Sequence, residues 1–442
     1  MKRRRWGSLS ASTVYPRELL RAIGKFLPRR GLSLQSEDRR VRWTDRLLVV
    51  MALLMAWQTA SSLKDAFESS WAVLTRLYPT RRRGGHSYEG FIKTLALRSG
   101  RLLPLVAGAL RQAVKRVAGR DWTIGGWVVM GVDGSRVNCP RTSANEAAFG
   151  CAGKDRTTPQ QFLTTVLHVG TGLVWDWRRG GGKEAERNHL REMIAGLPPG
   201  ALLLADAGFT GYELLKDLMA GGRSFIIRAG GNVRLLKKLG FAVREGDGVV
   251  CLWPQAHRRE APLVLRLAVV HDGRKAVYLL TNVLEEGRLT DAQIGAMYRR
   301  RWGLEVFYRS LKRTLEKHTL RSQSPVKAAV ELDWSLAGLW LLGLMTVERM
   351  ARRGMSATDW SVAQALRVVR RVMSGRGGRQ AARGLRGLGQ AHKDRYVRHR
   401  PKAARNWPNK KTESPPKPPV IRTATVAERL KAKRFRDKHV AA

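Results

Sequence analysis

The order of apolar segments in the second quarter of the chain constrains its fold more than any other feature. Residues 127–132, 161–169 and 172–177 are short apolar runs bounded by turn residues, a pattern typical of buried strands. A helical pattern over residues 184–197 leads into a fourth apolar run at 201–205. Three consecutive strands, a helix and a strand predict an antiparallel meander whose first strand lies parallel to the fourth. The sequence therefore predicts an α/β protein built on a mixed sheet.

The chain carries a very large positive charge. Its 442 residues include 82 Lys and Arg but only 35 Asp and Glu, which gives a net charge of +47 at pH 7. Such a charge destabilises a compact protein by self-repulsion unless a polyanion screens it, so nucleic acid is the first partner to expect. Three widely spaced cysteines indicate a reducing cytosol and exclude a zinc ribbon or a disulfide scaffold.

An anionic membrane surface is the other polyanion that this charge would attract. The longest apolar runs, residues 47–57 and 336–345, are much shorter than the roughly 20 residues that a bilayer-spanning helix needs. The basic N-terminus is similar to the start of a signal peptide, but no apolar stretch or cleavage site follows it. We therefore expect no transmembrane helix and a protein of the cytoplasm.

The two ends of the chain differ in composition from its centre. Residues 1–120 show helical periodicity with basic linkers, which suits a helical DNA-binding domain and, almost as well, a purely structural helical cap. Residues 371–442 contain 21 Lys and Arg against four acids, and a proline-rich run at 414–419. This composition predicts a basic, largely disordered tail that contacts phosphates, although residues 424–438 could form a basic helix on a polyanion.

Acidic residues follow two of the predicted strands. Asp133 comes directly after the first strand and Asp206 directly after the fourth. Either aspartate alone is explained by ordinary turn chemistry. Together, on strands predicted to be neighbours, they form a candidate site for a hard divalent cation such as Mg²⁺ or Mn²⁺. Glu184 and Glu186 stand just before the predicted helix and are expected to be first-turn acids rather than ligands.

A helix is predicted from Tyr298 to Lys312, with Gly303 tolerated inside it. At about 100° per residue, one side of this helix presents a phenol, a guanidinium, a carboxylate and an ammonium. These groups belong to Tyr298, Arg301, Glu305 and Lys312. A solvated face with ion pairs explains most charged helices of this kind. The alternative is a surface that holds DNA phosphates beside a metal.

These segments resemble the bacterial insertion-sequence transposases of the DDE superfamily. Tyr298, Arg301, Glu305 and Lys312 reproduce the Tyr-(2)-Arg-(3)-Glu-(6)-Lys signature of one branch. The resemblance covers roughly residues 125–320 and is specific because three blocks occur in the family's order. The other matching segments are 133–135 with Pro140, Asn145 and 149–150, then 206–209 with 211–212, and finally 278–282.

The resemblance implies a ribonuclease-H-like, mixed-sheet catalytic core. In such a core Asp133, Asp206 and Glu305 would be the catalytic, metal-binding residues. Two Mg²⁺ ions, for which Mn²⁺ can substitute, would activate water or a terminal 3′-hydroxyl and stabilise the leaving oxygen of an in-line phosphoryl displacement. The expected activity is DNA strand cleavage and strand transfer at the ends of an insertion sequence.

The same resemblance implies which residues bind DNA. Tyr298, Arg301 and Lys312 would hold phosphates near the end of the element, the arginine through bidentate bonds and the lysine as a point charge. Relatives in this branch process the end through a DNA hairpin, with an aromatic side chain stacked on a flipped base. Trp253 and Trp302 are candidates for that role, although tryptophan is more often a core residue.

The resemblance also divides the centre of the chain. Residues 121–220 would form the first part of the catalytic core, and 286–370 its second part, with the catalytic helix and the C-terminal helices. Residues 221–285 would form an inserted β-rich domain, in agreement with four strand-like runs between residues 224 and 281.

The expected partner is double-stranded DNA, both the terminal inverted repeats of the element and its target. Synapsis of two ends implies a homodimer in the DNA complex, with no membrane involved and a place in the bacterial cytoplasm beside the nucleoid. One alternative is a transposase-derived DNA-binding protein without catalytic activity, which would not need three carboxylates. Another is a basic RNA-binding or ribosome-associated protein, which would explain the charge but not the aspartates or the signature helix.

Overall fold

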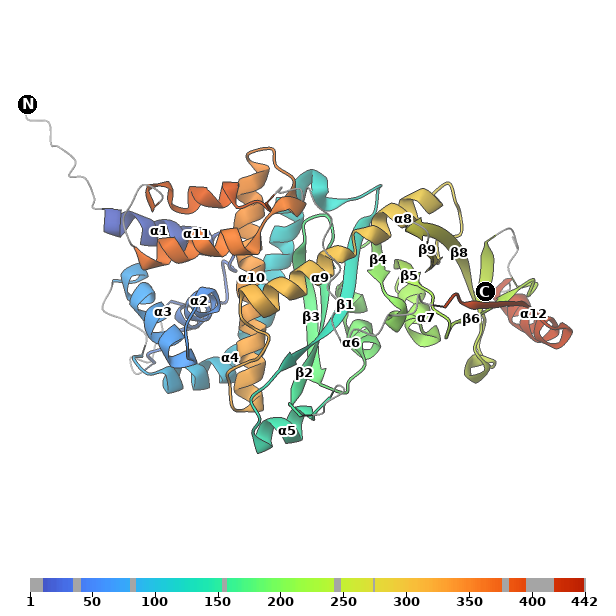
Figure 1. Cartoon of the computed structure of the whole chain (residues 1–442), viewed down its shortest axis with the longest axis horizontal. Coiled ribbons are helices and arrows are strands. Elements are labelled where there is room, and N and C mark those ends of the chain that lie inside the picture. Colours follow the sequence, from blue (N-terminus) through green and yellow to red (C-terminus); the bar gives the residue numbers. More distant parts are fainter. Residues whose placement is uncertain are drawn as a thin grey trace, which may run out of the picture.

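The protein is described by a computed structural model over residues 11–34, 41–79, 85–152, 157–241, 248–272, 275–375, 381–394 and 417–440. It is an α/β molecule with a large mixed sheet, and Figure 1 shows an elongated shape with a helical body at one end. The strands lie in the order β10-β6-β7-β8-β9-β5-β4-β1-β2-β3. Their bounds are Val128–Asn138 (β1), Gln160–His168 (β2), Leu173–Gly181 (β3), Ala201–Ala205 (β4), Ser224–Arg228 (β5), Arg234–Lys237 (β6), Val249–Leu252 (β7), Leu263–Asp272 (β8), Lys275–Thr281 (β9) and Val420–Thr423 (β10).

The predicted meander and its parallel neighbour are confirmed. β1 pairs antiparallel with β2, β2 antiparallel with β3, and β4 lies parallel to β1 on its other side. Helix α6 (Glu186–Met193) connects β3 to β4. β1 runs further than predicted because its second half stays paired with β2, from Asp133 opposite Thr165 to Asn138 opposite Gln160. Asp133 therefore lies inside β1 rather than at its end, whereas Asp206 directly follows β4 as predicted.

The strands between residues 224 and 281 continue the same sheet. β5 pairs in parallel with β4, and β9 pairs antiparallel with β5. β8, β7 and β6 follow edge to edge, all antiparallel. The β-rich stretch is thus an edgewise extension of the sheet that carries the two aspartates, and α7 (Tyr212–Ala220) precedes it.

Helices from both halves of the chain form one body around α10. The Trp57 indole of α2 donates a hydrogen bond of 2.9 Å to the carbonyl of Gly338 in α10, and a side chain at Gly338 would place its Cβ 2.5 Å from that of Ala56. The Trp334 indole of α10 donates to the Ser99 hydroxyl of α4. The helices of this body are α1 (Ala11–Gly24), α2 (Asp45–Trp57), α3 (Leu63–Leu77), α4 (Tyr88–Ala118), α10 (Pro325–Ala351) and α11 (Val362–Ser374), and short α5 (Ser143–Phe149) follows β1.

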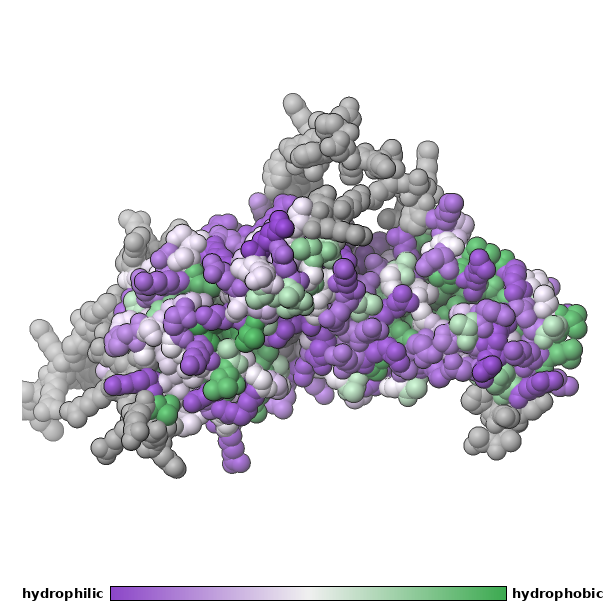
Figure 2. Space-filling model, turned by 90° about the horizontal axis from the view of Figure 1, so that it is seen from below, coloured by the Kyte–Doolittle hydropathy of each residue, from purple (hydrophilic) through white to green (hydrophobic). Residues whose placement is uncertain are grey.

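The surface of the molecule is largely polar. Figure 2 shows one face on which hydrophilic residues predominate and hydrophobic patches are small. Among the described residues, α10 is the helix long and apolar enough to cross a bilayer, and its apolar window is wholly buried inside the protein. That burial is what the central helix of a packed core shows.

The structure corrects the prediction of a largely disordered tail for those of its residues that it describes. The chain forms 3₁₀-helical turns within Ala381–Gln390, interrupted by a kink at Gly384, then strand β10 and helix α12 (Val426–Val440), close to the basic helix considered for residues 424–438. β10 pairs in parallel with β6, which would otherwise be an open sheet edge. Arg258 and Arg422 both bind the Glu428 carboxylate, so the start of α12 is fixed to the sheet. Residues 376–380 and 395–416 lie outside the described part.

The single helix predicted from Tyr298 to Lys312 is divided into three pieces. Tyr298 lies in α8 (Asp291–Arg299), Glu305 in α9 (Trp302–Arg309), and Lys312 in a π-helical turn at Ser310–Thr314. Between α8 and α9, the backbone N–H groups of residues 300, 301, 303 and 304 each donate to the carbonyl three residues back, the pattern of a tightened 3₁₀ turn. Figure 1 shows α8 and α9 following one another across the sheet.

Candidate active site

The two aspartates lie at the level where the pairing of β1 with β4 stops. The last paired residues are Gly131 and Leu204, and each aspartate is two positions further along its own strand. Residues two apart on a strand share a face, so both carboxylates belong to the face of the sheet that Gly131 and Leu204 occupy. One oxygen of Asp133 accepts the Gly134 N–H at 2.9 Å, and one of Asp206 accepts the Gly208 N–H at 2.9 Å.

Helix α9 packs directly on this face and brings Glu305 to it. A side chain at Gly131 would place its Cβ 2.9 Å from Cδ1 of Leu304, so glycine allows the helix to approach. The buried hydroxyl of Tyr308 donates to the carbonyl of Asp133 at 2.7 Å. Tyr308 thereby fixes α9 against the strand that carries the aspartate. The sequence analysis missed this residue, because nothing in its spacing distinguishes it from a core aromatic.

Arg301 connects the carboxylates of different elements. Its guanidinium lies 3.7 Å from Oδ2 of Asp133 and 3.8 Å from Oε1 of Glu305. Both separations exceed hydrogen-bond length, so these are loose ion pairs. The Arg301 guanidinium also lies 5.9 Å from the ring centre of Tyr298, within cation–π range. The structure therefore brings together Tyr298, Arg301, Glu305 and Asp133, despite the break between α8 and α9.

The carboxylates sit in an unfavourable electrostatic environment. Burial raises the pKa of Asp133 to about 6, with Asp206 and Glu305 adding to the effect and Arg301 opposing it. A fourth carboxylate, Glu186, belongs to the same group: burial raises its pKa to about 7, and the negative charges of Asp206 and Asp133 contribute. Acids that raise one another's pKa values are typical of sites that bind cations or move protons.

Glu186 is the residue of the cluster that the sequence analysis placed elsewhere. It is a first-turn acid of α6, as predicted, and its partner acid Glu184 accepts bonds from the Gly181 N–H and from His189 instead. The signal that could have found Glu186 is the pair of glycines, Gly134 and Gly208, that follow the two aspartates. Small residues at those positions leave room for a further side chain.

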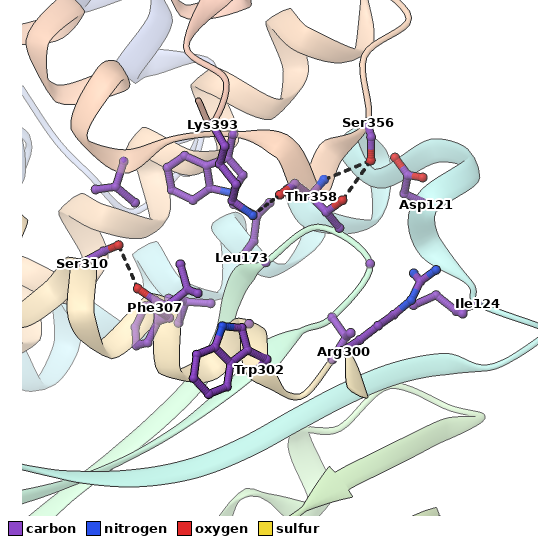
Figure 3. Close-up of a pocket in the computed structure, with 18 of the residues that line it drawn as sticks. Asp121, Ile124, Leu173, Arg300, Trp302, Phe307, Ser310, Ser356, Thr358 and Lys393 are labelled. Atoms are coloured by element: carbon purple, nitrogen blue, oxygen red, sulfur yellow. Dashed lines mark hydrogen bonds between the residues drawn. The ribbon is translucent and has the colours of Figure 1, made fainter. Parts of the chain in front are cut away.

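Among the described residues, no hydrogen bond or ion pair joins Lys312 or Trp302 to the carboxylates of this cluster. Burial lowers the pKa of Lys312, and no ion pair holds its ammonium among the described residues. Trp302 is 62% exposed and borders a cavity of about 590 Å³. Figure 3 shows it across this cavity from Lys393, with Arg300 beside it, and the Lys393 ammonium donates to the carbonyl of Thr358 at 2.6 Å.

Trp253 does not join this region. It is 2% exposed, and its indole donates to the carbonyls of His257 and Glu260. The Arg258 guanidinium covers its ring at 4.4 Å, and the Phe435 ring of α12 meets it edge-on. The structure contradicts the base-stacking role predicted for Trp253, because its ring is enclosed in the core where the tail docks on the sheet.

A second group of potential metal ligands lies beyond α7. Oxygens of Glu213 and Glu260 and a nitrogen of His257 lie within 4.8 Å of one another. The imidazole Nδ1 of His257 is 2.9 Å from Glu260 and 3.2 Å from Glu213, and the Lys216 ammonium also pairs with Glu260. These contacts between the side chains explain the grouping without a bound metal ion.

Comparisons with known proteins give matches to the segment that contains this site. Residues 128–341 match the family model described as the transposase DDE domain. The chain is 29% identical over 222 residues to transposase InsG for insertion sequence element IS4 of Escherichia coli strain K12, a match that covers 47% of this chain and 49% of that protein. The chain thus spans about half the length of this curated relative.

A solved structure also shows similarity at the level of the whole chain. It is the cryo-EM structure of the piggyBac transposase synaptic complex with hairpin DNA, with a TM-score of 0.37, 13% sequence identity, and coverage of 90% of this chain and 85% of that one. A TM-score of this size carries no argument about the site. The family-model match and the curated relative support the resemblance to insertion-sequence transposases. Membership of the Tyr-Arg-Glu-Lys branch stays a prediction. Over residues 128–341 the chain is similar to the transposase DDE domain family, and over 222 residues it is similar to the transposase of a bacterial insertion-sequence element.

Proposed function

We propose that the protein is an active DDE transposase that cleaves DNA strands and transfers them at the ends of an insertion sequence. The observation that carries the proposal is the grouping of Asp133, Asp206 and Glu305 around the end of the β1–β4 pairing, with Arg301 touching two of them. This grouping lies inside the segment that matches the transposase DDE domain. Separations of 73 and 99 positions along the chain make a purely local explanation inadequate.

The donor set suits hard divalent cations. Carboxylate oxygens are the ligands that Mg²⁺ and Mn²⁺ prefer, and burial raises the pKa of Asp133 more than the charge of Arg301 lowers it. Asp133, Asp206 and Glu305 would hold the ions, two Mg²⁺ in the proposed mechanism. Bound divalent ions supply the Lewis acidity that activates a hydroxyl nucleophile and stabilises the leaving oxygen in phosphoryl transfer.

The neighbouring side chains would position the DNA. Arg301 holds its two carboxylates loosely, at 3.7 and 3.8 Å, so its fork of donors remains available for a phosphate. Tyr298 stacks on Arg301 and orients it. Lys312, without an ion pair among the described residues, would add a point charge. Trp302 is exposed enough to stack on a base.

The remaining parts of the chain receive their roles by the same reasoning. We assign residues 121–220 and 286–370 to a ribonuclease-H-like core, 221–285 to its β-rich insertion, and 1–120 to DNA-end binding. The net charge of +47 supports phosphate contacts well outside the catalytic face, including those of the basic tail 371–442. A homodimer would hold two ends, in the cytoplasm beside the bacterial nucleoid.

The second hypothesis is a transposase-derived DNA-binding protein without catalytic activity. Positive charge alone would serve that function. Acids gathered beside the proposed DNA path oppose phosphate binding, because like charges repel and each carboxylate costs desolvation free energy. The carboxylate cluster therefore favours the catalytic hypothesis.

Cleavage of DNA that carries the element's inverted repeats tests the proposal. Asp133→Asn, Asp206→Asn and Glu305→Gln should each lower the cleavage rate roughly 10³-fold in Mg²⁺, about 4 kcal/mol of lost transition-state stabilisation. Binding of the same DNA should change little, because each variant alters one charge in a large excess. The matched control is Glu192→Gln, an exposed acid on α6. A variant that cuts at the wild-type rate would remove that residue from the catalytic set.

A further inference from the structure

The carboxylate of Glu186 lies between the two aspartates' glycines. A side chain at Gly134 would place its Cβ 2.6 Å from Oε2 of Glu186, and one at Gly208 would place its Cβ 2.3 Å from Oε1. The same Gly208 Cβ would lie 3.0 Å from Oδ1 of Asp206. One glutamate thus touches the chain one residue after Asp133 and two residues after Asp206.

The two glycines are explained by space rather than by backbone conformation. Neither Gly134 nor Gly208 has the positive φ that favours glycine, so an L-residue could adopt either backbone conformation. A contact below 3 Å would force the carboxylate of Glu186 to move away. A side chain at Gly134 would also meet the Phe162 ring at 2.6 Å, so glycine there leaves room for both groups, whereas at Gly208 the nearest atom is Oε1 of Glu186.

Glu186 reaches the site from the opposite side of the sheet to Glu305. Gly131 faces α9, and Gly134, three positions later on the regular strand β1, faces the other side, where α6 lies. The carboxylates can meet because β4 is no longer paired with β1 beyond Leu204. Ligands that arrive from both faces would enclose a cation more completely than the three predicted residues, which share one face with α9.

No structural partner accounts for the position of Glu186. Among the described residues, no hydrogen bond or ion pair holds its carboxylate. The charges of Arg187 and Arg136 oppose the raised pKa of Glu186 only in part, and the Arg136 guanidinium donates to the carbonyl of Gly182 and lies over the Phe162 ring at 5.2 Å. Partly buried carboxylates are normally paired, because an unpaired one loses hydration without compensation.

We propose that Glu186 is a fourth carboxylate ligand of the divalent-cation site, beside Asp133, Asp206 and Glu305. This inference rests on the proposed function, which supplies the cation. Gly134 and Gly208 serve as positioning residues, since they leave the volume that the Glu186 carboxylate occupies. Glu184, two residues earlier, has a structural role through the Gly181 N–H and His189.

Mn²⁺ titration of the full-length protein, read by the electron paramagnetic resonance signal of free Mn²⁺, tests the proposal without DNA or turnover. Glu186→Gln should weaken Mn²⁺ binding by about 10- to 100-fold, the range known for residues that support a metal site. Asp133→Asn should weaken it at least as much. Glu192→Gln removes the same charge from the same helix at an exposed position and should bind Mn²⁺ like the wild type.

A second variant keeps the charge of Glu186 and changes the space around its carboxylate, and the new Cβ would also lie 3.0 Å from Oδ1 of Asp206. Gly208→Ala retains Glu186 but displaces its carboxylate, so it should weaken Mn²⁺ binding as Glu186→Gln does, and it covers the case in which Glu186→Gln does not fold. Wild-type Mn²⁺ affinity in both Glu186→Gln and Gly208→Ala, with loss in Asp133→Asn, would overturn the role of Glu186 and leave the proposed function intact. Absence of Mn²⁺ binding in the wild type would overturn both.

Discussion

Two glutamates near the starts of two helices show how differently this protein treats buried acids. Glu331, in the second turn of α10, receives the Lys317 ammonium at 2.9 Å, the N–H groups of Arg321 and Ser322 at 3.0 Å, and the Ser322 hydroxyl at 2.9 Å. Glu186, in the first turn of α6, has no such bond among the described residues. Despite deep burial, the partners of Glu331 lower its pKa, whereas burial raises that of Glu186 to about 7.

The difference separates acids that stabilise the fold from acids that await a ligand. Glu331 joins the loop before α10 to the helix, and its charge is compensated within the chain. Asp133 and Glu186 face one another and Asp206, so their charges are compensated only loosely by Arg301 and by any bound cation. Keeping these acids close together lowers the stability of the folded protein but leaves the site ready to bind a cation, a compromise that is common at active sites.

The largest change in stability should come from substitution of Glu331, the acid whose charge is paired within the chain. Glu331→Gln leaves the ammonium of Lys317, which is 15% exposed, without its counter-charge. We expect a loss of about 3 kcal/mol in the free energy of unfolding, the cost of breaking a buried pair by removing one partner. Denaturant unfolding measures this, and Mn²⁺ affinity should stay unchanged. A loss below about 0.5 kcal/mol, the value of an exposed ion pair, would remove the contrast with Glu186.

Substitution of Asp133, which lies in the carboxylate cluster, should change the free energy of unfolding in the opposite direction. Asp133→Asn removes one of several mutually repelling charges, so the metal-free protein should gain about 1 kcal/mol in unfolding free energy, as substitutions at strained functional sites commonly do. Added Mn²⁺ should stabilise the wild type but not the variant, because only a ligand that binds the folded state shifts unfolding. Thermal unfolding with and without Mn²⁺ gives both numbers. Destabilisation in the absence of metal would mean that Asp133 is structurally compensated after all.

A smaller effect should be visible in the dependence of stability on pH. Folded, metal-free protein keeps the Glu186 proton up to about pH 7, while the unfolded chain loses it near 4.5. The folded state therefore binds more protons in this interval, and the unfolding free energy should fall as pH rises from about 4.5 to about 7. Glu186→Gln should flatten this fall. Denaturant unfolding in the presence of a chelator, measured for both proteins across this pH range, gives the difference in their unfolding free energies. An equal pH dependence in the variant and the wild type would mean that the pKa of Glu186 is ordinary.

The smallest effect is expected at an exposed acid on the same helix. Glu192 is 63% exposed and pairs with Arg178 at 3.3 Å. Glu192→Gln should change the free energy of unfolding by no more than about 0.5 kcal/mol, as for other surface ion pairs. Cleavage and Mn²⁺ affinity should match the wild type. A larger change in either would show that charge anywhere on α6 affects the site, and the comparison with Glu186 would lose its specificity.

Local chemistry explains which features the sequence could predict. The meander and its parallel neighbour follow from apolar runs and turn residues, and the register that aligns Asp133 with Asp206 follows from that topology. The match to the transposase DDE domain agrees with the family inferred from the spaced signature. The strand order followed from the short segments themselves, whereas the family followed from the resemblance of the motifs.

Features set by distant contacts were not predictable in this way. Glu186 joins the cluster only because Gly134 and Gly208 leave room for it, and that space exists only in the folded sheet. Tyr308 reaches the carbonyl of Asp133 across 175 positions. The ordered part of the tail depends on the open edge of β6, about 185 positions earlier in the chain, where composition alone indicated disorder.

The pairing of β10 with β6 also sets an order of events during synthesis. β6 emerges from the ribosome long before residues 420–423 exist, so its outer edge stays unpaired while nearly two hundred further residues are added. At the usual pace of translation, roughly 5 to 20 residues per second, that interval lasts on the order of ten seconds or more. During this time the nascent sheet offers a free edge to any other extended strand. A stalled or truncated product that stops before residue 420 would keep that edge exposed and would be prone to aggregate.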